Sequence, residues 1–315
     1  MTGGWRPGAT VALAVLAVQL VAFAASVALG VPTAYAGFAL ASAAALGYGN
    51  ARGAFETAAA VLATGLLLVL GLPLALLVAN QRPAAVASAA LDPAVQRALY
   101  LSVYGPLLAA VLAVALGVPL AYLLARGFPG RALVESLVDL PLVVPHSVAG
   151  IAVLYGFGRH GVLPGLSVVG TMTGLVLAMA FVSAPFAVNA AREAFEAVDR
   201  DTERAARSLG ASRWETFKRV TGPLAARGVL TGGVLSWARS VSEFGAVAIV
   251  AYNVEFFYPF SGSVASAQHA PVYIFTVFQR AGVDASGAVA TLLLALCAGV
   301  FLAVRTYAYD AERWP

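Results

Sequence analysis

The sequence predicts an all-α membrane protein, a polytopic bundle of transmembrane helices. Hydrophobic residues make up 61% of the chain and charged residues only 11%, whereas about a quarter of the residues in a soluble domain are charged. Several uncharged segments of about twenty residues are long enough, as helices, to cross a hydrocarbon core of about 30 Å. The long Ala/Leu/Val blocks lack the alternating pattern of a transmembrane β-barrel. The composition therefore excludes a soluble globular protein.

About eight transmembrane helices are expected, six in a core domain and two in an N-terminal membrane extension. The extension, residues 1–55, contributes helices near 10–30 and 33–49. The first has a longer apolar run than the roughly 7–15 residues of a signal peptide, so we expect a retained anchor. The core domain, residues 56–315, contributes helices near 57–79, 99–125, 136–157, 170–190, 225–251 and 284–305.

Basic residues between the predicted helices indicate the orientation in the membrane. Segment 191–227 carries eight arginine and lysine residues, an excess typical of cytoplasmic loops. Successive loops lie on alternate sides of the membrane, so a cytoplasmic segment 191–227 also makes the C-terminus cytoplasmic. If the N-terminus is cytoplasmic too, the N-terminal extension must cross the membrane twice, which favours eight spans over seven. The loops predicted to be external are 80–98, 158–169 and 252–283. Their only arginine or lysine residues are Arg82, Arg97, Arg159 and Arg280.

Two features interrupt the apolar character of the predicted helices. Pro141 and Pro145 free backbone carbonyl groups, which membrane helices tolerate at packed kinks or beside a water-filled cavity. Arg239 and Glu243 lie four residues apart on one helical face, where charges must pair or face water. A structural ion pair and a polar route through the bundle are both open. The candidate translocation pathway consists of Pro145, His146, Ser147, Arg239, Ser242 and Glu243.

The chain has no recognisable catalytic or nucleotide-binding motif. No HExxH sequence occurs, and the single lysine, Lys218, is not part of a phosphate-binding loop. The single cysteine, Cys297, lies in an apolar run and excludes an intrachain disulfide or a cysteine metal cluster. The basic residues are spread over membrane-flanking loops and do not indicate nucleic-acid binding. We therefore expect no enzyme, cofactor or metal site in this chain, so ATP-driven work requires a partner subunit.

Segment 199–223 is charged in an otherwise apolar chain. Asp201 or Thr202 is placed to cap a short helix from Glu203 to Leu209. Gly210 follows as the residue that ends this helix in the left-handed conformation.

A second short helix is expected directly after the first. Ser212 and Glu215 match a capping box at its start, and Pro223 is expected to mark its end. The predicted product is a pair of short helices at an angle, one of which presents small and charged residues outward.

This pair of helices resembles the EAA loop of ABC importer permeases. Ala205, Ala206, Gly210 and Pro223 fall on the spacing of that motif, whereas Arg204 occupies the usual glutamate position and Glu203 precedes it. The resemblance implies that the first helix docks into a cleft of a cytoplasmic ATPase. The coupling loop it implies comprises Glu203, Arg204, Ala205, Ala206, Leu209, Gly210, Ala211, Ser212, Arg213 and Pro223.

Other segments between residues 56 and 315 resemble permeases of molybdate/tungstate and sulfate importers. They are LARGFPGR (124–131), LPLVVPHSVAGIAVL (140–154), WARSVSEFGAVAIVAYN (237–253) and PVYIFTVFQRAG (271–282). The resemblance implies a homodimeric permease in membrane lipid that moves tungstate or molybdate into the cell. Its partners are an external oxyanion-binding protein and an ATPase dimer that holds ATP and Mg. The alternatives are sulfate or thiosulfate import, and a channel or secondary transporter.

Overall fold

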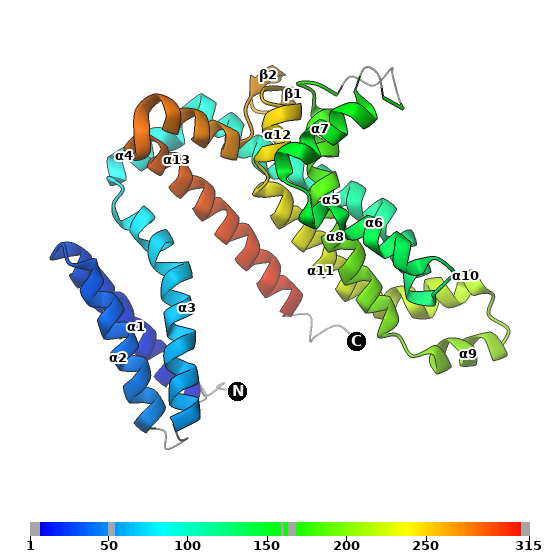
Figure 1. Cartoon of the computed structure of the whole chain (residues 1–315), viewed down its shortest axis with the longest axis horizontal. Helices are drawn as coiled ribbons and strands as arrows, with labels where there is room; N and C mark the ends of the chain where they lie inside the picture. Colours follow the sequence, from blue (N-terminus) through cyan, green and yellow to red (C-terminus); the bar gives the residue numbers. More distant parts are fainter. Residues whose placement is uncertain (1–6, 50–53, 159–160, 163–167, 310–315) are drawn as a thin grey trace. The chain divides into compact units, whose positions relative to one another are not determined.

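The computed structural model describes residues 7–49, 54–158, 161–162 and 168–309. Most of the predicted external loop 158–169 and the last six residues of the C-terminus lie outside these ranges. By their internal contacts the residues form two compact units, Met1–Gln81 and Arg82–Pro315 (Figure 1). The described residues are mostly helical, which confirms the predicted all-α class.

The first unit consists of three apolar helices, α1 (Pro7–Ala28), α2 (Pro32–Gly49) and α3 (Ala54–Ala79). Helix α2 packs against both α1 and α3. The sequence-based domain boundary at 55/56 would separate α3 from α2, and it stays a prediction.

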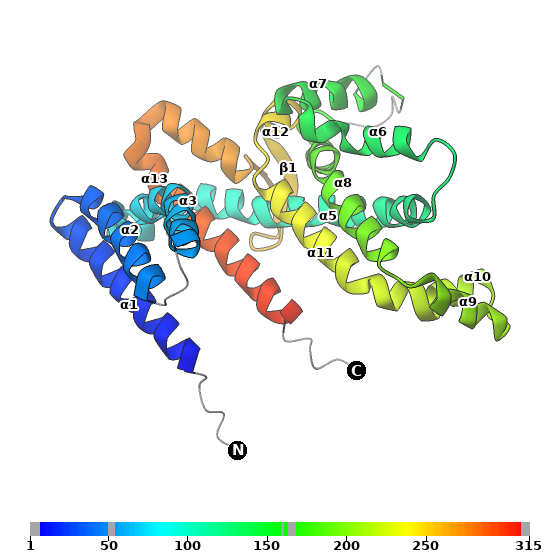
Figure 2. The same cartoon turned by 60° about the horizontal axis from the view of Figure 1, so that its bottom comes forward.

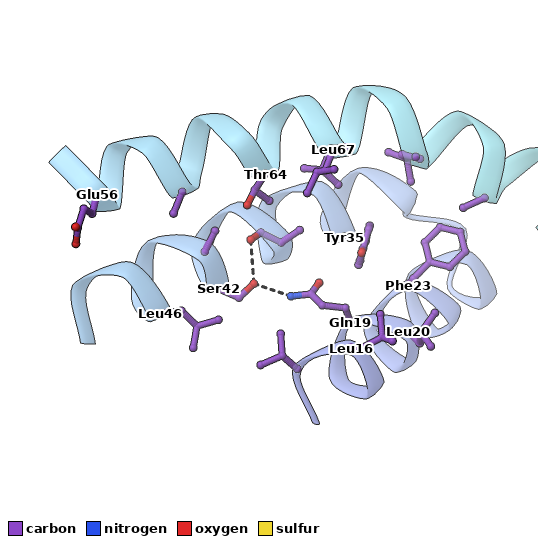
Figure 3. Close-up of a pocket in the computed structure, with 18 residues that line it drawn as sticks. Leu16, Gln19, Leu20, Phe23, Tyr35, Ser42, Leu46, Glu56, Thr64 and Leu67 are labelled. Carbon is purple, nitrogen blue, oxygen red and sulfur yellow. Dashed lines mark hydrogen bonds between the residues drawn. The ribbon is translucent and has the colours of Figure 1, made fainter. Parts of the chain in front are cut away.

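A groove of about 710 Å³ lies between the three helices of the first unit (Figure 3). Gln19 of α1 donates a hydrogen bond of 2.7 Å to the Ser42 hydroxyl of α2, and Phe23 contacts Tyr35 edge to face. Apart from such polar groups the lining is largely aliphatic.

The second unit is built around three long helices, α5 (Pro93–Arg126), α8 (Met172–Glu196) and α11 (Gly222–Val241). Small residues allow these helices to approach closely, as is usual in membranes. A Cβ atom added at Gly117 of α5 would lie 2.9 Å from Val188 of α8, and one at Gly232 of α11 would lie 3.0 Å from the Ala187 carbonyl oxygen. The core is fully buried at Leu101 and in the middle of α8.

Two of the predicted spans are interrupted. Span 136–157 consists of α6 (Arg131–Val143) and α7 (His146–Phe157). Val144 adopts an extended conformation, because the ring of Pro145 disfavours helical geometry in the residue before it. The predicted span is therefore interrupted before Pro145, whereas α6 continues through Pro141.

Span 225–251 divides in the same way, into α11 and the short helix α12 (Gly245–Val250). Predicting one continuous helix through Ser242–Phe244 was wrong. Further along, α13 (Ala270–Tyr309) begins well before the predicted 284 and kinks at Gly282, whose φ is +81°.

The segment 252–283, expected to be an external loop, is ordered into secondary structure. Strands β1 (Val254–Tyr258) and β2 (Ser263–Ala267) form an antiparallel hairpin in which Val254 faces Ala267. Before α5, the predicted loop 80–98 contains α4 (Pro83–Leu91). Asp92 caps the start of α5, since its Oδ1 accepts a hydrogen bond of 2.8 Å from the Ala94 amide.

Four described helices are long and apolar enough to cross a membrane: Ala54–Ala79, Pro93–Arg126, Met172–Glu196 and Ala270–Ala303. They support a multi-pass protein. The total of eight spans stays a prediction.

Candidate functional site

The charged segment folds into a helical hairpin that begins with α9 (Arg200–Ser208). Asp199 caps this helix, because its Oδ1 accepts a hydrogen bond of 2.9 Å from the Asp201 amide. The predicted cap at Asp201 or Thr202 was wrong. Asp199 already has the extended conformation that an N-cap requires, so the helix starts three residues earlier than expected.

Gly210 provides the predicted turn between the two helices, with a φ of +94°. The predicted capping box after it is confirmed: Ser212 Oγ accepts a hydrogen bond of 3.2 Å from the Glu215 amide, and Glu215 Oε2 accepts one of 2.8 Å from the Ser212 amide. Hydrogen bonds to the Glu215 carboxylate from the backbone amide and the side chain of Ser212 hold the pKa of Glu215 below its usual value.

The second helix does not end at Pro223, which corrects the prediction. Helix α10 (Arg213–Thr216) passes through a π-helical turn, Phe217–Thr221, directly into α11. Pro223 lies in the first turn of α11, where the absence of an amide N–H is tolerated. The hairpin is therefore continuous with a core helix of the bundle (Figure 2).

Glu203 fastens α9 to the bundle. Its carboxylate is buried and accepts hydrogen bonds from both terminal nitrogens of Arg126, the last residue of α5, one of them 2.7 Å long. It also accepts a hydrogen bond of 2.5 Å from the Thr221 hydroxyl. Burial would raise the pKa of Glu203, but the hydrogen bonds from Arg126 and Thr221 outweigh it and lower the pKa. Arg126 in turn lies over the Tyr122 ring.

The outer face of the hairpin is exposed. Arg204, at the position usually held by glutamate, is exposed and forms an ion pair of 2.6 Å with Asp201. Ala205 is exposed, Leu209 is 88% exposed and Trp214 68% exposed. Glu203 thus faces the bundle while Arg204 faces outward. Of the other predicted coupling residues, Ser212 and Arg213 are exposed, and Ala206 and Ala211 are half-buried.

A second site lies where the broken helices meet. Arg239 Nη2 is 2.8 Å from Glu243 Oε2, so the predicted ion pair is confirmed. The same nitrogen is 2.6 Å from His146 Nε2, which must accept the hydrogen bond because a guanidinium only donates. Glu243 is fully buried, and its other oxygen accepts a hydrogen bond of 2.9 Å from the Ala246 amide.

Two glycines let the break in α6–α7 approach the break in α11–α12. A Cβ atom at Gly245 would lie 2.7 Å from His146 Cβ, and one at Gly150 would lie 2.9 Å from the Ala246 carbonyl oxygen. The exposed candidates Pro145 and Ser147 adjoin His146 in the chain, and Ser242, also exposed, adjoins Glu243. The structure therefore brings all six candidate pathway residues to one place.

Sequence reasoning missed the partners of Glu203. Arg126 and Thr221 were not singled out, and they lie 77 and 18 residues from Glu203 in the chain. The only sequence signal was that Glu203 stands one position before the usual glutamate of the EAA motif. That position does not indicate whether the side chain points toward the bundle or away from it.

Long apolar helices, a polar cluster at two helix breaks and a hairpin fixed to one end of the bundle define a helical membrane transport protein. Residues 94–309 match the family described as binding-protein-dependent transport system inner membrane component. The chain belongs to this family.

Similar proteins agree with this assignment. The molybdate/tungstate transport system permease protein WtpB of Thermococcus kodakarensis is 39% identical over 215 residues, which are 68% of this chain and 79% of that protein. A probable molybdenum ABC transporter permease of Haloferax volcanii is 40% identical over 257 residues, 81% of this chain and 90% of its own. Probable sulfate permeases are also among the relatives.

A solved structure shows the same fold. A bacterial ABC transporter that imports the acidic polysaccharide alginate aligns with 81% of this chain and 96% of its own chain, with a TM-score of 0.61 and 16% sequence identity.

Proposed function

We propose that this chain is the permease subunit of a binding-protein-dependent importer that moves tungstate or molybdate into the cell. Two copies form the conduit in membrane lipid, and an external binding protein delivers the anion. A dimer of cytoplasmic ATPase subunits holds ATP and Mg and supplies the work, while the permease itself binds neither. Residues 191–227 and the C-terminus face the cytoplasm, and no nucleic acid takes part.

The observation that carries this proposal is the way the hairpin is mounted. The buried Glu203 carboxylate joins α9 to the end of α5, and the π-helical turn joins α10 to α11 without a flexible linker. A force applied to the exposed face of α9 therefore reaches two core helices. Through this rigid connection, closure of the ATPase dimer can shift the equilibrium between two conformations of the helix bundle.

The exposed face of α9 has the chemistry of a docking surface. Ala205 allows close approach because of its small side chain, and Leu209, 88% exposed, presents an apolar group that a partner can bury. An exposed large apolar side chain at the tip of a rigid element is typical of an interaction site. The ATPase cleft is the partner we assign to this face.

The polar cluster at the helix breaks is our candidate for the pathway. The positive charge of Arg239 is compensated by Glu243, so the cluster offers polarity without a strong net attraction for an anion. Weak binding suits a conduit, which must release what it admits.

The anion is assigned from the relatives named as molybdate/tungstate and molybdenum permeases. Sulfate or thiosulfate import is the alternative within the same class. Calorimetry on the cognate binding protein separates them: we expect retention of tungstate or molybdate, and selective retention of sulfate would overturn the substrate assignment.

Reconstitution tests the coupling. In proteoliposomes with the ATPase and the binding protein, we expect ATP-driven molybdate uptake that disappears when the ATPase is omitted. Gradient-driven uptake by the permease alone would instead support a channel or secondary transporter. Leu209→Asp should abolish uptake and binding-protein-stimulated ATP hydrolysis, whereas Leu209→Met should retain both. Full activity of Leu209→Asp would contradict docking through α9.

A further inference from the structure

The end of the second unit farthest from the hairpin contains a polar pocket of about 320 Å³. Two of its lining residues are Arg97 of α5 and Arg280 of α13, and none carries a carboxylate. Arg97 and Arg126 are at opposite ends of α5, 29 residues apart, which corresponds to about 44 Å along a helix. If the hairpin is cytoplasmic, the pocket opens toward the outside, where the substrate arrives.

The pocket is held in shape by hydrogen bonds between its walls. The buried Ser102 hydroxyl of α5 accepts a hydrogen bond of 2.7 Å from the Ala270 amide at the start of α13. The hydroxyl oxygen of Tyr252, a residue that follows α12, lies 2.9 Å from the hydroxyl oxygen of Thr276 in α13. The first part of α13 also packs against α4 (Figure 1). Three separate segments are thus tied into one concave site.

The charge of the pocket is not compensated within the described part of the chain. Neither Arg97 nor Arg280 forms an ion pair with a described residue, and the buried Nε of Arg97 lacks a hydrogen-bond partner there. Asp92 lies near enough to affect Tyr273, but its Oδ1 already accepts the Ala94 amide. A buried donor left without a partner is costly, so the site favours a ligand that accepts hydrogen bonds.

The remaining polar groups of the pocket are of the kind that bind oxygen anions. Asn253 and Gln268 bring amide groups, and Tyr252 and Thr276 bring hydroxyl groups. The pKa of Tyr252 is lowered by its hydrogen bonds with Thr276 and Gln268. Guanidinium groups are the side chains best suited to a tetrahedral oxyanion, since each offers several donors in a plane.

We propose that this pocket is an external oxyanion site, in which Arg97 and Arg280 hold the tetrahedral anion released by the binding protein before it enters the bundle. The inference rests on the proposed function and adds a defined entry site to it. Arg280 is exposed, but the buried Nε of Arg97 lies in a concave site, which fits a small anion better than the protruding acidic surface of a protein. The phosphate of an anionic lipid shares the chemistry of the ligand, and the experiment separates the two sources.

The test uses the full-length permease reconstituted with its ATPase and binding protein in zwitterionic lipid. We compare molybdate uptake and binding-protein-stimulated ATP hydrolysis for the wild type, Arg97→Gln, Arg280→Gln and the double variant. Each single variant should slow uptake severalfold and the double variant about tenfold or more, while stimulated hydrolysis persists. Arg97→Lys should keep part of the uptake. Arg82→Gln, which removes a charge from the same predicted side but outside the pocket, should match the wild type.

Four results would overturn the inference. Wild-type uptake by the double variant would show that the arginines hold no substrate, while the proposed function stands. Parallel loss of stimulated hydrolysis would show that they dock the binding protein. Wild-type uptake that requires added anionic lipid, with a double variant insensitive to that lipid, would assign the pocket to a lipid phosphate. A wild-type complex that takes up no oxyanion would overturn the proposed function itself, and this inference with it.

Discussion

Arg126, the last residue of α5, donates a hydrogen bond of 2.7 Å from Nη1 to Oε2 of Glu203 in α9. The pair joins the end of a core helix to the hairpin that we assign to ATPase docking. The Glu203 side chain is only 7% exposed, so removal of its charge leaves the Arg126 guanidinium without its anionic partner.

Glu203→Gln should loosen α9 without unfolding the bundle. The variant keeps the size of the side chain but loses a charge-assisted hydrogen-bonded pair, a loss of about 1–3 kcal/mol. Hydrogen exchange should be faster by about one to two orders of magnitude in α9 and unchanged in α8. Unchanged exchange in α9 would contradict the anchoring role. Asp201→Asn, which removes an exposed carboxylate from the same helix, serves as the matched control.

The same pair has a defined pH dependence. The pKa of Glu203 is lowered in the folded protein, so its stabilisation is present above the usual glutamate value, about 4.3. It is lost as the pH falls through the lowered folded value. The difference in α9 exchange between wild type and Glu203→Gln should therefore be constant from about pH 5 to pH 8 and shrink below about pH 4. A difference that varied between pH 5 and pH 8 would contradict this assignment.

Local chemistry made the hairpin partly predictable from the sequence. The turn at Gly210 and the capping box of Ser212 and Glu215 depend on residues within four positions of one another, and both are confirmed. The start of α9 was wrong because several polar residues compete for the cap, and the backbone selects Asp199. Pro223 was a poor stop signal because a proline is also compatible with the first turn of a helix.

Contacts between distant segments were not predictable. Arg239 and Glu243 are four residues apart and their pairing follows from that spacing, but His146 joins them from 93 residues away. The hairpin of β1 and β2 escaped notice because each strand has only five residues. Its alternation of buried Val254 and Phe256 with exposed neighbours was the available signal.

Gly210 should tolerate asparagine far better than valine. Its φ of +94° lies in a region that β-branched residues rarely adopt, and nothing lies within 4 Å of an added Cβ atom. The cost is therefore one of backbone strain, about 1–3 kcal/mol for valine. Binding-protein-stimulated ATP hydrolysis should fall at least several-fold in Gly210→Val and remain near wild type in Gly210→Asn. Equal activity of the two variants would show that the turn conformation does not matter for coupling.

Arg239 and Glu243 should behave as one unit. Glu243 is fully buried and Arg239 is 18% exposed, so removal of either partner leaves a charge largely out of water, at a cost of about 3–5 kcal/mol. Arg239→Gln and Glu243→Gln should each lower the thermal midpoint of the purified permease. The double variant should be more stable than the sum of the two losses predicts. Additive losses would show that the pair is not energetically coupled.

Gly150→Ala should separate the two helix breaks that form the polar cluster. The added Cβ atom would lie 2.9 Å from both the Ala246 carbonyl oxygen and Ile249 Cβ, so α7 or α12 must shift, at a cost of about 1–3 kcal/mol. Gly156→Ala in the same helix meets nothing within 4 Å and is the control. We expect a lower thermal midpoint and slower molybdate uptake for the first variant only. Gly150 contacts α12, and His146 of the polar cluster lies at the start of the same helix, α7. If the cluster lines the pathway, the loss of molybdate uptake should therefore be larger than the loss of stability accounts for. A stable Gly150→Ala permease with full uptake would show that this close approach is not required.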